Sequence, residues 1–326
     1  MKYPGRRFLH LAVVAVAVFW VSLSGHGAWS QATRTIKIVV AASPGGSLDF
    51  LARVLGEQIG QAEGQTVLIE DRGGAGGVIG AEAVWRTTPD GKTMLMTSPD
   101  LLVGQHLRKL NFDLLTSFEP ICYLVNVPTV IAVNSSSPYQ TLSELLSAAR
   151  AKPGDLTLAS IGPATVFQIA IESLKRAAKV DMTFIPYPGG APVLNALLGE
   201  HVTSGFFSYS TMAEQIRAGK LRALATASRT RIEPLPEVPT VAESGYKDYE
   251  MDYWYGVLAS ARTPKNAISQ LADLFIAALK APEVKGKLVA QALYPVGICG
   301  ADFAALLRKQ YDGYGRAIRE TNIKAE

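Results

Sequence analysis

The sequence predicts an α/β fold of parallel sheets covered by helices. Short apolar runs of strand length alternate along the chain with stretches in which apolar residues recur at helical spacing. Turns rich in Gly and Pro separate them, as at Pro153-Gly154 and Pro188-Gly189-Gly190. Strand, helix and strand in alternation favour parallel units with the helix packed on one face of the sheet, which gives the predicted fold class.

Nine apolar runs are expected to form strands, because each has strand length and is bounded by turn residues or a helical pattern. They span residues 36–42, 66–71, 92–98, 129–134, 156–161, 182–187, 202–207, 221–228 and 253–260. Helical spacing is clearest over residues 48–59, 142–149 and 271–278. No low-complexity tract or internal repeat interrupts this order.

Residues 1–30 predict a secretory signal peptide. Three basic residues precede an apolar run over residues 8–23, and Ala28-Trp29-Ser30 supplies small residues where a signal peptidase cuts. The alternative is a retained membrane anchor, for which this run is short. We therefore expect cleavage after Ser30 or Ala32 and a mature protein in the periplasm.

Charge and length limit the class of protein. The chain has 32 Lys and Arg against 28 Asp and Glu, and residues 1–30 hold three of the basic residues and no acidic ones. The mature chain is thus close to neutral, which argues against nucleic acid as a partner. About 300 residues remain after cleavage, enough for two domains with a core each.

Cys122 and Cys299 are the two cysteines of the chain. A disulfide between them is possible in an oxidising compartment, but two cysteines do not make a disulfide framework. Cys299 stands directly before the helical pattern GADFAALLRK, so we interpret it first as a residue at a helix start and leave the pairing open.

The sequence carries few of the patterns typical of enzymes. His106 and His201 are the histidines of the mature chain, and the motifs HExxH, CxxC and GxSxG are absent. The run EDRGGAGGVIG has Gly74, Gly76 and Gly80 at a spacing one residue away from the dinucleotide fingerprint, so we interpret it as a close turn between a strand and a helix. No catalytic residue, metal site or cofactor is expected.

Small turns recur instead at the ends of the predicted strands, and three of the four contain glycine: SPGGSLD (43–49), TSPD (97–100), SIGPAT (160–165) and YPGGAP (187–192). In α/β sheets such turns converge beyond the carboxyl ends of the strands and form ligand sites. The first turn is followed by a helical pattern whose N-terminal amides favour an anion. It lacks the Gly-Lys-Ser/Thr of a phosphate loop, so a carboxylate fits better.

These segments resemble a known family. The motifs SPGGSLDFLARVLGEQIG, EDRGGAGGVIGAEAV, PDGKTMLM, FEPICYLV, IPYPGGAPVLNALLGEHV, IRAGKLRALATAS, LPEVPTVAESGY and YWYGVLASARTPKNAI are similar to those of Bug-type solute-binding receptors of tripartite tricarboxylate transporters. The likeness covers nearly the whole mature chain. It implies a periplasmic-binding-protein-like fold of two α/β domains with a ligand cleft between them and two hinge crossings, near residues 129–134 and 253–260. Domain I would comprise residues 33–131 plus 256–326, and domain II residues 132–255.

The resemblance also implies the ligand-binding residues. Domain I would grip the ligand carboxylate through the loops after two of its strands, and domain II would supply three turns. The implied set is Ser43, Gly45, Gly46, Ser47, Asp49, Thr97, Ser98 and Asp100, followed by Ser160, Gly162, Thr165, Tyr187, Gly189, Gly190, Ala191, Phe207 and Ser208.

Three positions depart from the family pattern. Gln168, Pro188 and Phe207 stand where a histidine, a lysine and an aspartate are common. An amino acid would need a buried anion opposite its amine, and a tricarboxylate would need cations that the four turns lack. Aromatic residues gather near the domain II turns: Phe167, Tyr187, Phe206, Phe207 and Tyr209. We therefore expect a monocarboxylate or small dicarboxylate with an aromatic or apolar body.

The expected function is that of an extracytoplasmic receptor, a monomer, which closes on a small organic carboxylate and delivers it to membrane transporter subunits. One alternative keeps the same binding event and has the loaded form signal to a sensor kinase. The other is a secreted α/β enzyme.

Overall fold

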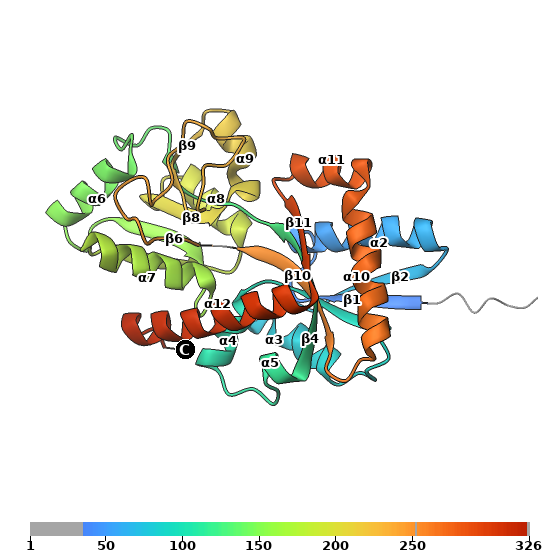
Figure 1. Cartoon of the computed structure of the whole chain (residues 1–326). Helices are drawn as coiled ribbons and strands as arrows, with labels where there is room; N and C mark the ends of the chain where they lie inside the picture. Colours follow the sequence, from blue (N-terminus) through green and yellow to red (C-terminus); the bar gives the residue numbers. More distant parts are fainter. Residues whose placement is uncertain (1–34, 252, 325–326) are drawn as a thin grey trace, which may run out of the picture. The chain divides into compact units, whose positions relative to one another are not determined.

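The computed structural model describes residues 35–251 and 253–324. The predicted signal peptide and its alternative, a membrane anchor, lie outside these residues. Within them the chain forms two sheets, of six and five strands. The elements of the first sheet stand on the right of Figure 1 and those of the second on the left. Across these described ranges, every helix is too short or too polar to cross a bilayer.

The first sheet has the strand order β11-β4-β10-β3-β1-β2. Its strands are β1 (Thr35–Val40), β2 (Thr66–Asp71), β3 (Thr93–Thr97), β4 (Phe118–Asn126), β10 (Trp254–Ser260) and β11 (Tyr294–Cys299). Its helices are α2 (Ser47–Glu63), the 3-10 turn η1 (Ala75–Gly77), α3 (Val78–Trp85), α4 (Asp100–Leu107), α5 (Leu114–Ser117), α10 (Lys265–Lys280), α11 (Pro282–Ala290) and α12 (Gly300–Thr321).

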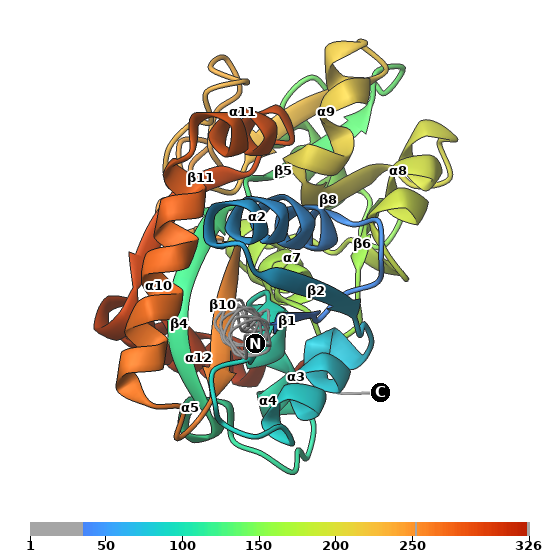
Figure 2. The same cartoon turned by 90° about the vertical axis from the view of Figure 1, so that its right-hand side faces the viewer.

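Helices cover both faces of this sheet because its strands are apolar on both sides. Ile38 and Val40 of β1 pack in the core cluster that includes α2 and α10, whereas Val39 packs in the cluster that includes α3, α4 and the start of α12. Figure 2 shows α2 above β1 and β2, and α3 and α4 below them.

The second sheet has the order β7-β6-β8-β5-β9. Its strands are β5 (Thr129–Asn134), β6 (Thr157–Ile161), β7 (Thr183–Tyr187), β8 (Ser204–Ser208) and β9 (Leu221–Thr226), and its helices are α6 (Leu142–Ala151), α7 (Val166–Ala178), α8 (Gly190–Leu198) and α9 (Tyr209–Arg217). The nine predicted strands are therefore present, with shifts of a few residues at their ends.

The prediction of parallel sheets is correct only for part of each sheet. Strands β2, β1 and β3 are parallel, as are β7, β6 and β8. In contrast, β10 runs antiparallel to β3 and β4, and β5 runs antiparallel to β8 and β9. The chain enters the second sheet at β5 and returns to the first at β10, and both of these strands are reversed. The edge strand β11 is reversed as well, because it runs antiparallel to β4. The residue boundaries proposed for two domains stay a prediction.

Two strands were not expected, β4 and β11, and a disulfide joins them. Cys122 and Cys299 lie opposite each other in the antiparallel pairing, and their sulfur atoms are bonded. Cys299 is the last residue of β11 and also the N-cap of α12. The interpretation of Cys299 as a residue at a helix start is therefore right, but taking it in preference to a disulfide is wrong, because the strand before it places it beside Cys122.

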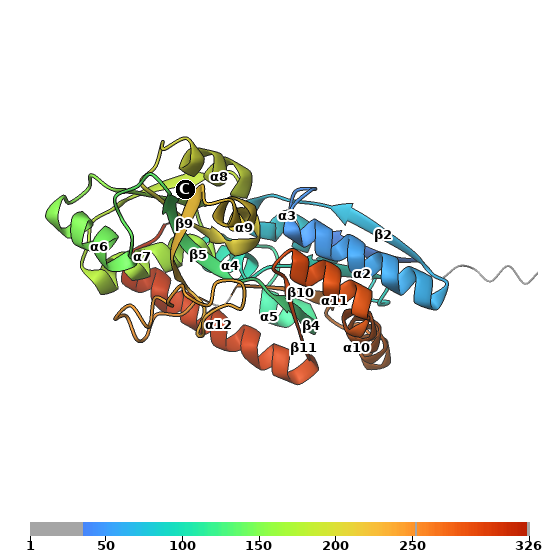
Figure 3. The ribbon, with the colours of Figure 1, turned by 90° about the horizontal axis from the view of Figure 1, so that it is seen from above.

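The helix α12 belongs to the first sheet at its start and reaches the second at its end. Phe303, near its start, packs with Tyr123 and Trp254 of the first sheet. Near its other end, Glu320 accepts a salt bridge of 3.0 Å from Arg176 of α7. Figures 1 and 3 both show α12 passing along α7.

Candidate functional site

Loops at the carboxyl ends of strands in both sheets meet beside α4 and α7. The backbone N–H of Val166, the first residue of α7, donates to Oδ1 of Asp100, the first residue of α4, at 2.9 Å. The η1 turn lies at the same place, because a side-chain carbon built on Gly76 would stand 3.6 Å from the carbonyl of Asp100 and 3.8 Å from that of Ala164. The predicted turns of the two sheets are thus in contact.

The loop after β1 leaves the N-terminus of α2 without a side-chain cap. The N-cap is Gly46, in an extended conformation, and no side chain bonds to the helix there. Gly45 has a φ of +83°, which favours glycine, and its N–H donates to Asp49 at 2.8 Å. Asp49 is buried and also pairs with Arg53 at 2.7 Å. Asp49 therefore holds the loop in shape, while the first amides of α2 remain suited to an anion.

Two tyrosines connect this loop to the loop after β3. Ser47 shares a hydrogen bond of 2.6 Å with the hydroxyl of Tyr255, and the ring of Tyr255 packs edge-on against that of Tyr253. The Tyr253 hydroxyl donates to Oδ2 of Asp100 at 2.6 Å. Burial raises the pKa of Tyr255 to about 12 and raises the pKa of Tyr253 well above 10.0, so both hydroxyls carry their protons at neutral pH.

Asp100 is the centre of the loop after β3. Ser98 donates to its Oδ2 at 3.2 Å, and Thr97 is buried just before it. Burial raises the pKa of Asp100, against the opposing effect of hydrogen bonds from Tyr253, Val166 and Ser98. The carboxylate is thus the acceptor for groups from both sheets.

The turn after β6 forms a complete cap for α7. Thr165 accepts from the N–H of Gln168 and donates to the carbonyl of Ile161 at 3.0 Å, while Oε1 of Gln168 accepts from the N–H of Ala164 at 2.8 Å. These reciprocal bonds resemble a capping box. Gln168, which departs from the family pattern, therefore has a structural role at this helix.

Two further predicted residues of this region, Ser160 and Gly162, make close contacts within the second sheet. Ser160 is fully buried, and its hydroxyl donates to the carbonyl of Phe206 on the adjacent strand. Gly162 lies against the ring of Phe184, where an added side-chain carbon would come within 3.1 Å. Their part in ligand binding stays a prediction.

Aromatic rings form a continuous row from the second sheet to the tyrosines. Phe167 lies 4.9 Å from both Phe207 and Tyr253, measured between ring centroids. The ring of Phe207 lies over the N-terminus of α8, since a side-chain carbon on Gly190 would be 2.2 Å from it. As strand alternation predicts, Phe206 is fully buried in the core, and Phe207 on the other side is half-buried.

The remaining predicted residues surround the ends of β7 and β8. Tyr187 and Gly189 are half-buried, and Ala191 is exposed. Ser208 shares a hydrogen bond of 3.0 Å with Thr211 in the first turn of α9. Tyr209 is buried in the core of the second sheet, in a different cluster from Phe167 of the aromatic row.

The sequence predicts the turn at η1 but not its place beside Asp100, and it does not single out Tyr253 and Tyr255. Tyr253 and Tyr255 alternate around Trp254, a period that puts both on one face of a strand, and this was the available signal. In the glycine run, Gly74, Gly76 and Gly77 have positive φ angles. A side-chain carbon on Gly80 would lie 3.0 Å from the carbonyl of Arg72, as a close turn requires.

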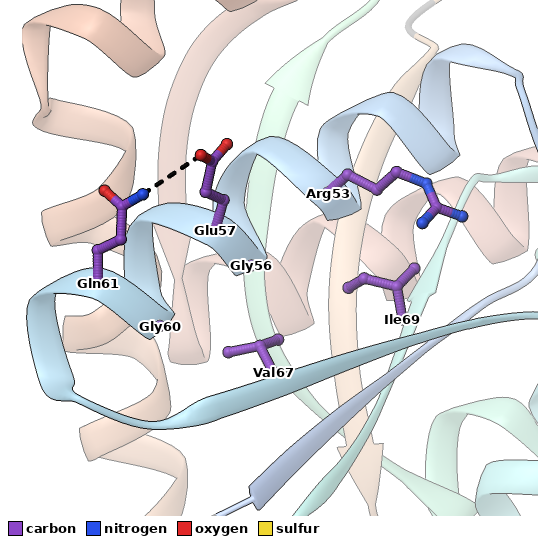
Figure 4. Close-up of a pocket in the computed structure, with 7 residues that line it drawn as sticks. All are labelled: Arg53, Gly56, Glu57, Gly60, Gln61, Val67 and Ile69. Carbon is purple, nitrogen blue, oxygen red and sulfur yellow. Dashed lines mark hydrogen bonds between the residues drawn. The ribbon is translucent and has the colours of Figure 1, made fainter.

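A separate hollow of about 520 Å³ lies between α2 and β2 (Figure 4). It is lined by Arg53, Gly56, Glu57, Gly60, Gln61, Val67 and Ile69. It contains none of the predicted ligand residues, and its Arg53 already pairs with Asp49 and Asp71. No group of three or more His, Cys, Asp or Glu suited to a metal ion occurs in residues 35–251 and 253–324.

Two proteins of known sequence resemble this chain over almost its full length. A protein encoded in the tcbD-tcbE intergenic region of a Pseudomonas species is 31% identical over 323 residues, which cover 98% of this chain and 96% of that protein. The protein BugT of Bordetella pertussis is 31% identical over 320 residues, 96% of this chain and 98% of BugT.

Solved structures agree in fold. The periplasmic binding protein BugD has a TM-score of 0.80 and 30% identity, covering 90% of this chain and 99% of BugD. An R. palustris protein solved with adipate has a TM-score of 0.82 and 27% identity, covering 89% and 98%. MatC of Rhodopseudomonas palustris, with bound malate, has a TM-score of 0.78 and 26% identity, covering 87% and 98%.

The family model for the tripartite tricarboxylate transporter family receptor matches residues 51–323. That family consists of solute-binding receptors and not of enzymes. The match spans both sheets apart from β1, and every loop of the candidate site except the one that follows β1. The chain therefore belongs to the receptors of the tripartite tricarboxylate transporter family.

Proposed function

We propose that this protein is a periplasmic receptor that binds a small organic carboxylate at the loops where its two sheets meet and delivers it to a tripartite membrane transporter. The observation that carries the proposal is the N-terminus of α2. It has no side-chain cap, and the hydrogen-bonded hydroxyls of Ser47 and Tyr255 stand beside it. Free amides and hydroxyl donors suit a carboxylate group.

The related structures support the ligand class. Adipate and malate, the ligands named for two of them, are both carboxylates. The family description supports the transporter as the receiver of the ligand. Residues 1–30, with their signal-peptide pattern, support export to the periplasm.

The row of aromatic rings supports an apolar or aromatic ligand body. Phe207, which is half-buried, stands where the family pattern more often has an aspartate, and the fully buried Phe167 packs against its ring. No Lys or Arg occurs in the four turns at the strand ends. A ligand amine would lack a partner at Phe207, and the three charges of citrate would lack cations. A monocarboxylate or a small dicarboxylate matches the charge of this site better.

Contacts from both sheets support capture by hinge closure. A ligand that touches loops of both sheets binds the closed arrangement more tightly than the open one, and this difference in affinity shifts the equilibrium. Closure then offers the transporter a shape that only the loaded receptor has.

Calorimetric titration of the mature protein with benzoate, hexanoate, succinate, citrate and aspartate tests this proposal. We expect saturable binding of at least one of the first three and weaker binding of citrate and aspartate. Tightest binding of citrate or aspartate would refute the ligand class, and a panel with no binding would refute the receptor function. Loss of uptake of the best ligand in cells without this gene would test delivery to the transporter.

A further inference from the structure

We infer that Asp100 is the residue that sets the selectivity of this site, by excluding ligands that carry a second carboxylate. The inference rests on the proposed function, because it concerns which carboxylates the receptor accepts. It follows from the position of Asp100, which supplies a carboxylate from within the protein at the place where the two sheets meet.

The carboxylate of Asp100 occupies the N-terminus of α7. Its Oδ1 accepts the N–H of Val166, and the next amides of the turn are taken by Thr165 and by the side chain of Gln168. A helix N-terminus favours one anion in this place, and here the chain itself provides it. By contrast, α2 has no side-chain cap at its own N-terminus. The two helix ends therefore differ: one receives an internal carboxylate and the other is left for a ligand.

Asp100 in its ionised form has no cation beside it. Its direct partners are the hydroxyls of Ser98 and Tyr253 and the N–H of Val166, all neutral donors. None of the salt bridges found in residues 35–251 and 253–324 includes Asp100. With a side chain 6 % exposed, this charge is poorly screened by water. A second ligand carboxylate brought toward α7 would meet like charge and find the N–H groups of Val166 and Gln168 already engaged.

A chain of side-chain contacts connects the N-terminus of α2, where we propose that the ligand carboxylate binds, to Asp100 at the N-terminus of α7. Ser47 bonds to Tyr255, the ring of Tyr255 packs on Tyr253, and Tyr253 bonds to Asp100. A ligand whose carboxylate lies at α2 thus has the two tyrosine rings between that carboxylate and Asp100. An uncharged tail can lie along the rings, whereas a tail that ends in a carboxylate approaches Asp100.

The test compares ligands that differ only in the second carboxylate, namely hexanoate with adipate and butyrate with succinate. Dissociation constants are measured by calorimetry at pH 7.5 for the wild type, Asp100→Asn and Tyr253→Phe. Asp100→Asn keeps the shape and the acceptor for Val166 but removes the charge. Tyr253→Phe is the control for the hydrogen bond, since it removes a hydrogen bond to Asp100 and leaves the carboxyl group in place. Circular dichroism confirms folding, and Asp100→Ser replaces the Asn variant should that variant not fold.

We expect the wild type to bind each monocarboxylate at least tenfold more tightly than its dicarboxylate partner. In Asp100→Asn this ratio should fall by a factor of about ten, and in Tyr253→Phe it should fall less, because the carboxyl group stays. A wild type that binds dicarboxylates as tightly as monocarboxylates, or an unchanged ratio in Asp100→Asn, would overturn the inference and leave the proposed function standing. Absence of binding by any carboxylate to any variant would overturn the proposed function and this inference with it.

Discussion

Replacement of Gly46 by Val should weaken carboxylate binding without destabilising the protein. Gly46 has φ −84° and ψ 173°, an extended conformation that β-branched residues adopt easily. A side-chain carbon there would have only the carbonyl oxygen of Ser43 within 4 Å, at 3.7 Å. The branched side chain would, however, cover the amides at the start of α2, to which we propose that the ligand carboxylate binds.

The size of both effects follows from this geometry. A hydrogen bond to a charged group contributes about 1.5–3 kcal/mol, so the loss of one such bond weakens binding about 10- to 150-fold. Val is a less favourable N-cap than Gly, which lowers stability, but Val also reduces the entropy of the unfolded chain, which raises it. Because these two effects oppose each other, the free energy of unfolding should change by no more than about 0.5 kcal/mol.

Titration of a ligand identified in the panel and urea unfolding measure these two quantities for Gly46→Val. Gly45→Val is the control for strain, because its φ of +83° is costly for a branched residue and should lower stability by about 1–2 kcal/mol. Unchanged affinity in Gly46→Val, with a lower stability, would show that this turn only supports the fold.

Three further outcomes are expected. Replacing Cys122 and Cys299 by Ser removes a disulfide that joins residues 177 positions apart in the sequence. Chain entropy predicts that this lowers the free energy of unfolding by about 5 kcal/mol. A loss below about 1 kcal/mol in urea unfolding would contradict the prediction. Gly190→Ala should displace the ring over α8 and weaken ligand binding in calorimetry, whereas Gly189→Ala, with open space around it, should not; equal effects would exclude the ring as cause. Burial raises the pKa of Asp100 above 3.8, so as pH rises the unfolded state loses this proton before the folded state does. The free energy of unfolding should therefore fall as pH rises from about 4 toward neutrality. Urea midpoints measured against pH should fall less for Asp100→Asn than for the wild type, and an equal fall in the two proteins would contradict this.

The two strands that escaped prediction show where local patterns fail. β4 contains Pro120 and lies between two other strands, a position that a proline normally excludes. The pairing with β10 shifts register beside Pro120, and this irregularity accommodates the missing N–H. β11 contains Pro295 and Gly297 and is an edge strand with its own register shift. In both cases the partner strand, distant in sequence, decides the structure.

The candidate site was predictable as a group of loops and not as a set of contacts. Turn residues at strand ends identify the loops, because the carboxyl ends of parallel strands share an edge. The bond from Val166 to Asp100 joins positions 66 residues apart, and no local pattern contains it. Asp49 and Asp100 are both predicted ligand residues, and the structure adds their partners within the protein, Arg53 for Asp49 and Val166 for Asp100. The full list of ligand residues stays a prediction.

The helix α12 has mechanical consequences for a receptor that closes. Its first residue follows Cys299, which a covalent bond ties to β4 of the first sheet. Its far end is held without covalent bonds, by the exposed ion pair of Arg176 and Glu320 and by the buried side chains of Ile318 and Ile323. The two ends of the helix are therefore attached in different ways. If the receptor closes as proposed, a rotation of one sheet against the other would have to rearrange the non-covalent contacts at the far end, while the disulfide keeps the start of the helix at β4.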